Sequence, residues 1–134
     1  QEAKSQCDKA ISSELYQTPE NAHSNLGKVF SAMGNNEKAI EQQKKALQIR
    51  PDFCISYIAL GETYAKMQSF EKAYESYKMA IQNCPADQQL SYQAGMMAFR
   101  AGRKDKAREE FHYLINNFKT GEYVEKARSS LKLL

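Results

Sequence analysis

The most informative stretch of the sequence is residues 54–87, which read CISYIALGETYAKMQSFEKAYESYKMAIQNCPAD. Apolar and small residues recur three and four positions apart on both sides of Gln68-Ser69, a spacing that predicts two amphipathic α-helices. The polar break between them is short, so the two helices are expected to run antiparallel. Pro85 follows the second helix and ends it, because proline has no backbone N–H to donate.

The same pattern occurs three times without insertions, in residues 20–53, 54–87 and 88–121. A glycine recurs every 34 residues, and an alanine follows each glycine by twelve; these residues are Gly27, Gly61, Gly95, Ala39, Ala73 and Ala107. Small residues at fixed points let paired helices approach closely, and a bulky side chain fills the space beside them. A repeat of this length indicates stacked helical hairpins rather than one closed core.

The three copies resemble the tetratricopeptide repeat family over about three quarters of the chain. The second copy has the expected small or bulky residue at every position, whereas the first has His23 and Gln43 at two usually aromatic positions. The third copy departs further, with Ser91, Leu114 and Lys119 in place of the usual residues. The resemblance implies an all-α fold, a right-handed superhelix of three helical hairpins within a single domain, residues 1–134.

The last hairpin of such a stack needs a lid over its apolar face. Residues 122–134 carry one apolar stripe at helical spacing, formed by Val124, Ala127, Leu131 and Leu134. This stripe predicts a C-terminal capping helix, with Thr120 as its N-cap residue.

The N-terminal segment, residues 1–19, is expected to hold a helix over 2–15 followed by a loop. This helix either covers the first hairpin or is the second helix of a truncated upstream repeat. Thr18 and Pro19 predict the start of the next helix, since threonine suits the N-cap and proline the first helical position.

The composition gives no support for catalysis or nucleic-acid binding. Net charge is +3 with acids and bases interspersed, and no apolar run approaches the roughly 18 residues of a membrane span. His23 and His112 lack a Cys, Asp or Glu partner at ligand spacing, which favours helix packing as their role. Glu109-Glu110 are adjacent rather than on one helical face, so we interpret them as solvated charges. We therefore expect a non-enzymatic protein without cofactor or metal.

The resemblance also implies that the first helix of each hairpin lines a concave groove. The groove residues predicted to bind a partner are Lys28, Ile55, Ile58, Glu62, Lys66, Tyr92, Met96, Phe99 and Arg100. This surface is apolar in its centre and basic at its rim, which suits a partner peptide, a partner helix or an acyl chain. The alternative is that these side chains pack between repeats, or that the N-terminal helix fills the groove.

Co-chaperones of this family bind acidic C-terminal peptides through a two-carboxylate clamp of Lys, Asn and Arg side chains. None of the five clamp positions carries the expected residue here; they hold Ser24, Lys28, Ala59, Gln89 and Gln93. A conventional clamp is therefore absent.

Cys54 and Cys84 are the first and thirty-first residues of the second copy. Because the two helices are antiparallel, these positions return to the same end of the hairpin, and a disulfide there would contribute about 3 kcal/mol. The alternative is a pair of reduced thiols in a reducing cytosol. Cys7 has no predicted partner and is expected to be a free thiol.

These features predict a protein–protein interaction scaffold. The segment from Phe111 to Leu134 resembles bacterial envelope tetratricopeptide proteins, among them the pilotin lipoproteins that help assemble the outer-membrane secretin of type IV pili. That resemblance implies a periplasmic or outer-membrane location, with any lipid anchor lying outside this chain. Two alternatives stay open: a cytoplasmic adaptor or co-chaperone domain, and a carrier of a lipid or acyl chain.

Overall fold

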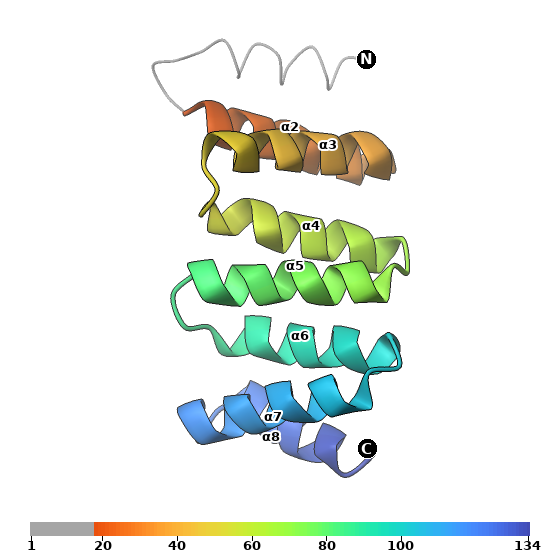
Figure 1. Ribbon diagram of the computed structural model, residues 1–134, viewed down its shortest axis with the longest axis vertical. Helices are drawn as coiled ribbons and strands as arrows, with labels where there is room; N and C mark the ends of the chain where they lie inside the picture. The colour runs from red at the N-terminus through yellow and green to blue at the C-terminus, as the bar shows by residue number, and fades with distance from the viewer. Residues whose placement is uncertain (1–17) are drawn as a thin grey trace. The chain divides into compact units, whose positions relative to one another are not determined.

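The computed structural model describes residues 18–134, which contain seven α-helices and no β-strand. The helices are α2 (Pro19–Ala32), α3 (Asn36–Ile49), α4 (Cys54–Lys66), α5 (Phe70–Asn83), α6 (Gln88–Arg100), α7 (Lys104–Phe118) and α8 (Glu122–Leu131). These bounds confirm the all-α repeat fold, with two helices in each of the three copies (Figure 1). The helix expected over residues 2–15 lies outside the described residues.

The chain divides into two compact units, and the boundary between them falls after Thr63. In the first unit, α2 packs against α3 as an antiparallel neighbour. In the second unit, α6 packs against both α5 and α7, and α8 packs on α7 and α6. The C-terminal helix therefore covers the last hairpin, as the apolar stripe of residues 122–134 predicts.

The predicted start of α2 is confirmed. Thr18 is the N-cap residue, and its Oγ1 accepts a hydrogen bond from the backbone N–H of Asn21 at 3.4 Å. Pro19 occupies the first helical position, where its missing N–H leaves no helical bond unmade. In the first two hairpins the second helix, α3 or α5, stops two residues before Pro51 or Pro85, which cannot continue a helix.

Close helix approach depends on the glycine at the eighth position of each copy. A Cβ on Gly95 would lie 2.5 Å from Cε1 of Phe111, and a Cβ on Gly27 would lie 2.6 Å from Nε2 of Gln43. Phe111 and Gln43 both occupy position 24 of their copies, so the residue at that position fills the space above the glycine. The predicted pairing of a small residue with a space-filling one is thereby confirmed in the first and third copies.

Gln43 shows how a polar residue replaces the usual aromatic one. Its Nε2 donates to the carbonyl oxygen of Ser24 at 3.0 Å, and its Oε1 accepts from Oγ of Ser56 at 2.8 Å. The buried amide is therefore paired on both sides, which removes most of the cost of burying it. His23, the other unusual residue, places Nδ1 2.7 Å from Oε1 of Gln42, which fits its expected role in helix packing.

The start of α8 differs from the prediction. The N-cap residue is Gly121 rather than Thr120, and no side chain caps the helix. Gly121 has a φ of 129°, a conformation that essentially only glycine adopts at low cost, and a Cβ there would lie 2.6 Å from Oε1 of Gln88. The helix therefore begins one residue later than the predicted N-cap, Thr120, would place it.

Candidate partner-binding surface

In the first unit, three of the four predicted groove residues are exposed. Ile55 is 41% exposed, and Lys28 and Glu62 are also exposed, whereas Ile58 is half-buried. Ser24, which the family register places on the groove, is 1% exposed and therefore belongs to the core. The backbone oxygen of Ser24 accepts a hydrogen bond from Nε2 of Gln43 at 3.0 Å, which ties this part of α2 to α3.

In the second unit, the predicted groove residues of α6 share one side of that helix, which we call the α6 face: Tyr92, Met96, Phe99 and Arg100. Phe99 is 38% exposed, and Arg100 and Lys66 are exposed as well. Met96 is half-buried. An exposed phenylalanine beside a methionine is the kind of apolar surface that protein partners cover.

Tyr92 differs from the other residues of the α6 face because it packs within the protein. Its ring centroid lies 5.8 Å from that of Phe111 and 5.6 Å from that of Tyr123, in tilted arrangements. Nζ of Lys126 lies 6.0 Å from the Tyr92 ring centroid and 5.1 Å from the Tyr123 ring centroid. Tyr92 therefore fastens α8 to α6, and replacing it would lower stability as well as any binding.

A small apolar pocket opens where α6 meets the C-terminal end of the chain. Its volume is about 50 Å³, and its lining residues are Met96, Phe99, Phe111, Ser130, Leu133 and Leu134. Leu133 is 79% exposed although it borders the pocket. The contribution of Leu133 is not visible in the helical pattern, because α8 ends at Leu131 and a turn carries the last residues back, with Leu133 N–H donating to the Ser130 carbonyl.

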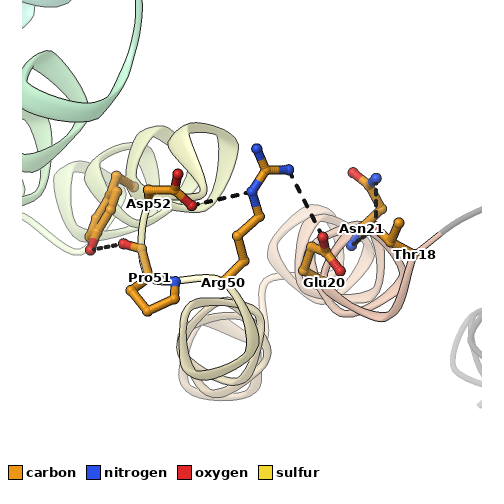
Figure 2. Close-up of polar contacts among 7 residues, drawn as sticks. Thr18, Glu20, Asn21, Arg50, Pro51 and Asp52 are labelled. Atoms are coloured by element: carbon orange, nitrogen blue, oxygen red, sulfur yellow. Dashed lines mark hydrogen bonds and ion pairs between the residues drawn. The ribbon is translucent and has the colours of Figure 1, made fainter.

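The end of the first hairpin carries an ion pair between its first and thirty-first residues (Figure 2). Nη1 of Arg50 lies 3.9 Å from Oε2 of Glu20, and its Nε donates to Oδ1 of Asp52 at 3.2 Å. Nearby, the Tyr57 hydroxyl donates to the Pro51 carbonyl at 2.7 Å. Side chains at positions one and thirty-one of a copy can therefore reach each other.

Cys54 and Cys84 occupy these two positions in the second copy. Both are disulfide-bonded in the structure. The third cysteine, Cys7, lies outside the described residues. We propose that Cys54 and Cys84 are bonded to each other, since the ion pair of the first copy supplies a precedent for that geometry.

Glu110 corrects the sequence interpretation of Glu109-Glu110 as solvated charges. Its side chain is buried, with the residue only 4% exposed, and Nζ of Lys78 lies 2.7 Å from Oε2. The Tyr74 hydroxyl donates to the same oxygen at 3.4 Å. The sequence contains a signal of this burial. Glu110 lies three residues after Ala107 and four before Leu114, so it falls on the apolar stripe of the helix.

This contact makes stability depend on pH through Tyr74. Burial, followed by the nearby Glu110 carboxylate, raises the pKa of Tyr74 from 10.0 to about 12. Between these values the unfolded tyrosine loses its proton while the folded one keeps it, so stability falls as pH rises from 10.0 to about 12. We expect Tyr74→Phe to lack this loss, so the stability advantage of the wild type over the variant should shrink across that window in urea unfolding.

The matched control is Tyr113→Phe, since Tyr113 is an exposed tyrosine on α7. Its stability should follow that of the wild type at every pH. Identical pH dependence in the wild type and in Tyr74→Phe would contradict the assigned burial of the Tyr74 hydroxyl.

Comparison with known families decides the identity of the repeats. A TPR repeat profile matches residues 27–68, and tetratricopeptide repeat profiles match residues 56–87 and 89–120. The chain belongs to the tetratricopeptide repeat family. Proteins of this family are interaction scaffolds that present extended binding surfaces on stacked helical repeats.

Solved structures of tetratricopeptide repeat proteins share the fold. PilW, a type IV pilus biogenesis factor, superposes with a TM-score of 0.80 at 22% identity, over 93% of this chain and 57% of that one. Pseudomonas aeruginosa PilF gives 0.67 at 17% identity, over 96% of this chain and 58% of that one. YrrB, described as having an unusual peptide-binding site, gives 0.69 at 17% identity, over 82% and 56%.

The chain thus spans less than two thirds of each of these three proteins, and the likeness shows the fold alone. No curated protein is a significant match to the sequence. Within residues 18–134, no helix is both long enough and apolar enough to cross a membrane. The same residues contain no cluster of three or more His, Cys, Asp or Glu side chains suited to a metal ion.

Proposed function

We propose that this tetratricopeptide repeat protein is a non-enzymatic scaffold that binds a peptide or helix of a partner protein on the groove side of its first helices. The observation that carries the proposal is the α6 face, where Phe99 is 38% exposed and, with Met96, borders an apolar pocket. Exposed aromatic and methionine side chains of this kind act as anchors in protein interfaces. Ile55 offers a second exposed apolar side chain on the first helix of copy two.

The test is a binding measurement with a peptide selected by the full chain from a random library. Phe99→Ala should weaken that peptide by about tenfold or more, which corresponds to more than 1 kcal/mol, because a central aromatic anchor is lost. The melting temperature should fall less than for a fully buried aromatic such as Phe111, since Phe99 is 38% exposed. Tyr113→Ala is the matched control and should leave binding unchanged, since Tyr113 is an aromatic on α7 with 46% exposure against 38% for Phe99.

Lys28 is expected to behave as a rim charge. It is exposed on α2, so Lys28→Ala should have a smaller effect on affinity that disappears at high salt. Unchanged binding in both Phe99→Ala and Lys28→Ala would contradict the proposed surface.

The carrier of a lipid or acyl chain is the weaker alternative. Sites that enclose a small molecule occupy about 300 Å³ or more. The apolar pocket beside α6 has about 50 Å³ and the larger, more polar one beside Tyr113 about 130 Å³, so neither would enclose an acyl chain.

We further propose that the partner belongs to a type IV pilus assembly, where a secretin is built, and that the chain works at the periplasmic side of an outer membrane. Support comes from the fold shared with PilW and PilF over most of this chain, and from the disulfide-bonded state of Cys54 and Cys84, which suits an oxidising compartment. A cytoplasmic adaptor is the competing proposal. It requires both cysteines to be reduced in protein taken from its native compartment.

A further inference from the structure

We infer that the pocket between α6 and the C-terminal turn accepts one aliphatic side chain of an acidic partner peptide. The inference rests on the proposed function and specifies the chemistry of the partner. Five of the six lining residues are apolar, and the sixth, Ser130, contributes only a hydroxyl. Such a lining favours the transfer of a hydrocarbon side chain from water.

The pocket is matched to a single side chain. Its volume of about 50 Å³ is far below that of sites that enclose a small molecule, about 300 Å³ or more. Met96 and Phe99 form part of the wall, and a methionine side chain can adjust to the shape of an incoming branched group. Leu133 is mostly exposed, and a bound peptide would bury part of its apolar surface.

The charges near the pocket favour a partner peptide with an acidic residue next to the side chain that enters the pocket. α6 contains no aspartate or glutamate, and Arg100 is its only charged residue. The Arg100 guanidinium lies over the Phe70 ring, with 5.5 Å between its carbon and the ring centroid, and makes no ion pair among residues 18–134. Lys132, beside Leu133 in the sequence, is exposed and likewise has no ion pair within the described part of the chain.

The acidic residues of α8 do not cancel these charges. Glu122 and Glu125 lie in the first turn of α8, at the opposite end of the helix from Lys132. Each is within ion-pair distance of a base on α8, since Lys126 Nζ lies 3.1 Å from Glu122 and Arg128 Nε lies 3.6 Å from Glu125. Arg100 and Lys132 are the chain neighbours of the lining residues Phe99 and Leu133, and no acidic side chain of α6 or α8 pairs with them. Their positive charges would favour aspartate or glutamate on the partner, next to the side chain that enters the pocket.

The experiment pans a random 16-residue phage-displayed peptide library against the full chain. We expect enriched peptides to carry Leu, Ile or Met with Asp or Glu nearby. The most enriched peptide, labelled with fluorescein, is then titrated by fluorescence anisotropy into the wild type, Arg100→Glu and Lys104→Glu. Lys104 is an exposed base at the start of α7 and is the matched control for charge reversal.

Arg100→Glu should weaken the peptide by about tenfold or more at low salt, and Lys104→Glu should change it less than threefold. A peptide with its acidic residue changed to lysine should recover affinity for Arg100→Glu. Met96→Ser should weaken both peptides, because it places a hydroxyl in the pocket wall.

Other outcomes separate this inference from the proposed function. Enriched peptides that are basic, or that bind Arg100→Glu and Met96→Ser as well as the wild type, would overturn the inference and leave the scaffold in place. Failure to enrich any peptide would overturn both. Self-association that Phe99→Ser abolishes, or sedimentation with phosphatidylcholine–phosphatidylglycerol vesicles that the same change abolishes, would assign the pocket to a second copy or to lipid instead.

Discussion

Replacing Phe111 with alanine is expected to lower the free energy of unfolding by about 3–5 kcal/mol, as is typical for a large buried aromatic. The side chain is 1% exposed and packs over Gly95 and against Tyr92. Its loss would leave a cavity between α6 and α7 and remove the support of the ring that fastens α8. Urea unfolding followed by circular dichroism at 222 nm measures the change.

Tyr113→Ala provides the matched control, since Tyr113 is two residues away on α7 and 46% exposed. It should cost less than about 0.5 kcal/mol, apart from any loss of helix propensity. Gly95→Ala should cost about 1–3 kcal/mol through overpacking, because its Cβ would lie 2.5 Å from the Phe111 ring.

The double variant Gly95→Ala with Phe111→Ala is expected to cost less than the sum of the two single changes, since the new Cβ enters space that the ring has vacated. Strict additivity would show that Gly95 and Phe111 are not in contact and would contradict the helix packing described.

Loss of the disulfide has the second large expected effect. If Cys54 and Cys84 are bonded to each other, Cys54→Ser with Cys84→Ser should lower stability by about 3 kcal/mol under oxidising conditions, through release of a constraint on the unfolded chain. The same loss should follow when the wild type is reduced. Cys7→Ser is the control, and its free energy of unfolding should equal that of the wild type.

Non-reducing peptide mapping of protein prepared without reductant tests the pairing itself. A cross-linked peptide that joins Cys54 to Cys84 is the expected product. Three free thiols in protein recovered from its native compartment would contradict the pairing and remove the residue-level support for an oxidising location.

Most of the fold could be predicted because residues that recur at the same position of each repeat mark helix contacts and helix ends. Gly27 and Gly95 recur where two helices touch, and Pro51 and Pro85 recur where helices end. Each constraint appears more than once at the same spacing, so chance departures in one copy do not obscure it. That redundancy is why the all-α repeat fold could be predicted from the sequence.

Features that occur once were missed. The adjacency of Glu109 and Glu110 predicts two solvated charges, whereas Glu110 is buried against Lys78 and Tyr74, which come from a helix more than thirty residues earlier. The start of α8 depends on the positive φ of Gly121, which no periodic pattern encodes. The place of Glu110 on the apolar stripe of α7 indicates its burial, but the identity of its distant partners and the backbone conformation of Gly121 have no local signal in the sequence.

The candidate surface stays a prediction. Phe99 and Arg100 are exposed where the family register places them, whereas Tyr92 turns out to pack against Phe111 and Tyr123. The pocket itself requires Leu133, which follows the end of α8 and reaches α6 through a turn. The apolar stripe of residues 122–134 includes Leu134 but not Leu133, because the helix ends at Leu131 and a turn brings Leu133 to the pocket.

Hydrogen–deuterium exchange with and without the selected peptide tests most directly whether a partner binds on the groove side. The account predicts slower exchange in α6 and in residues 129–134, with α7 from His112 to Phe118 unchanged. Bound peptide with protection confined to α5 and α7, and none in α6, would contradict it.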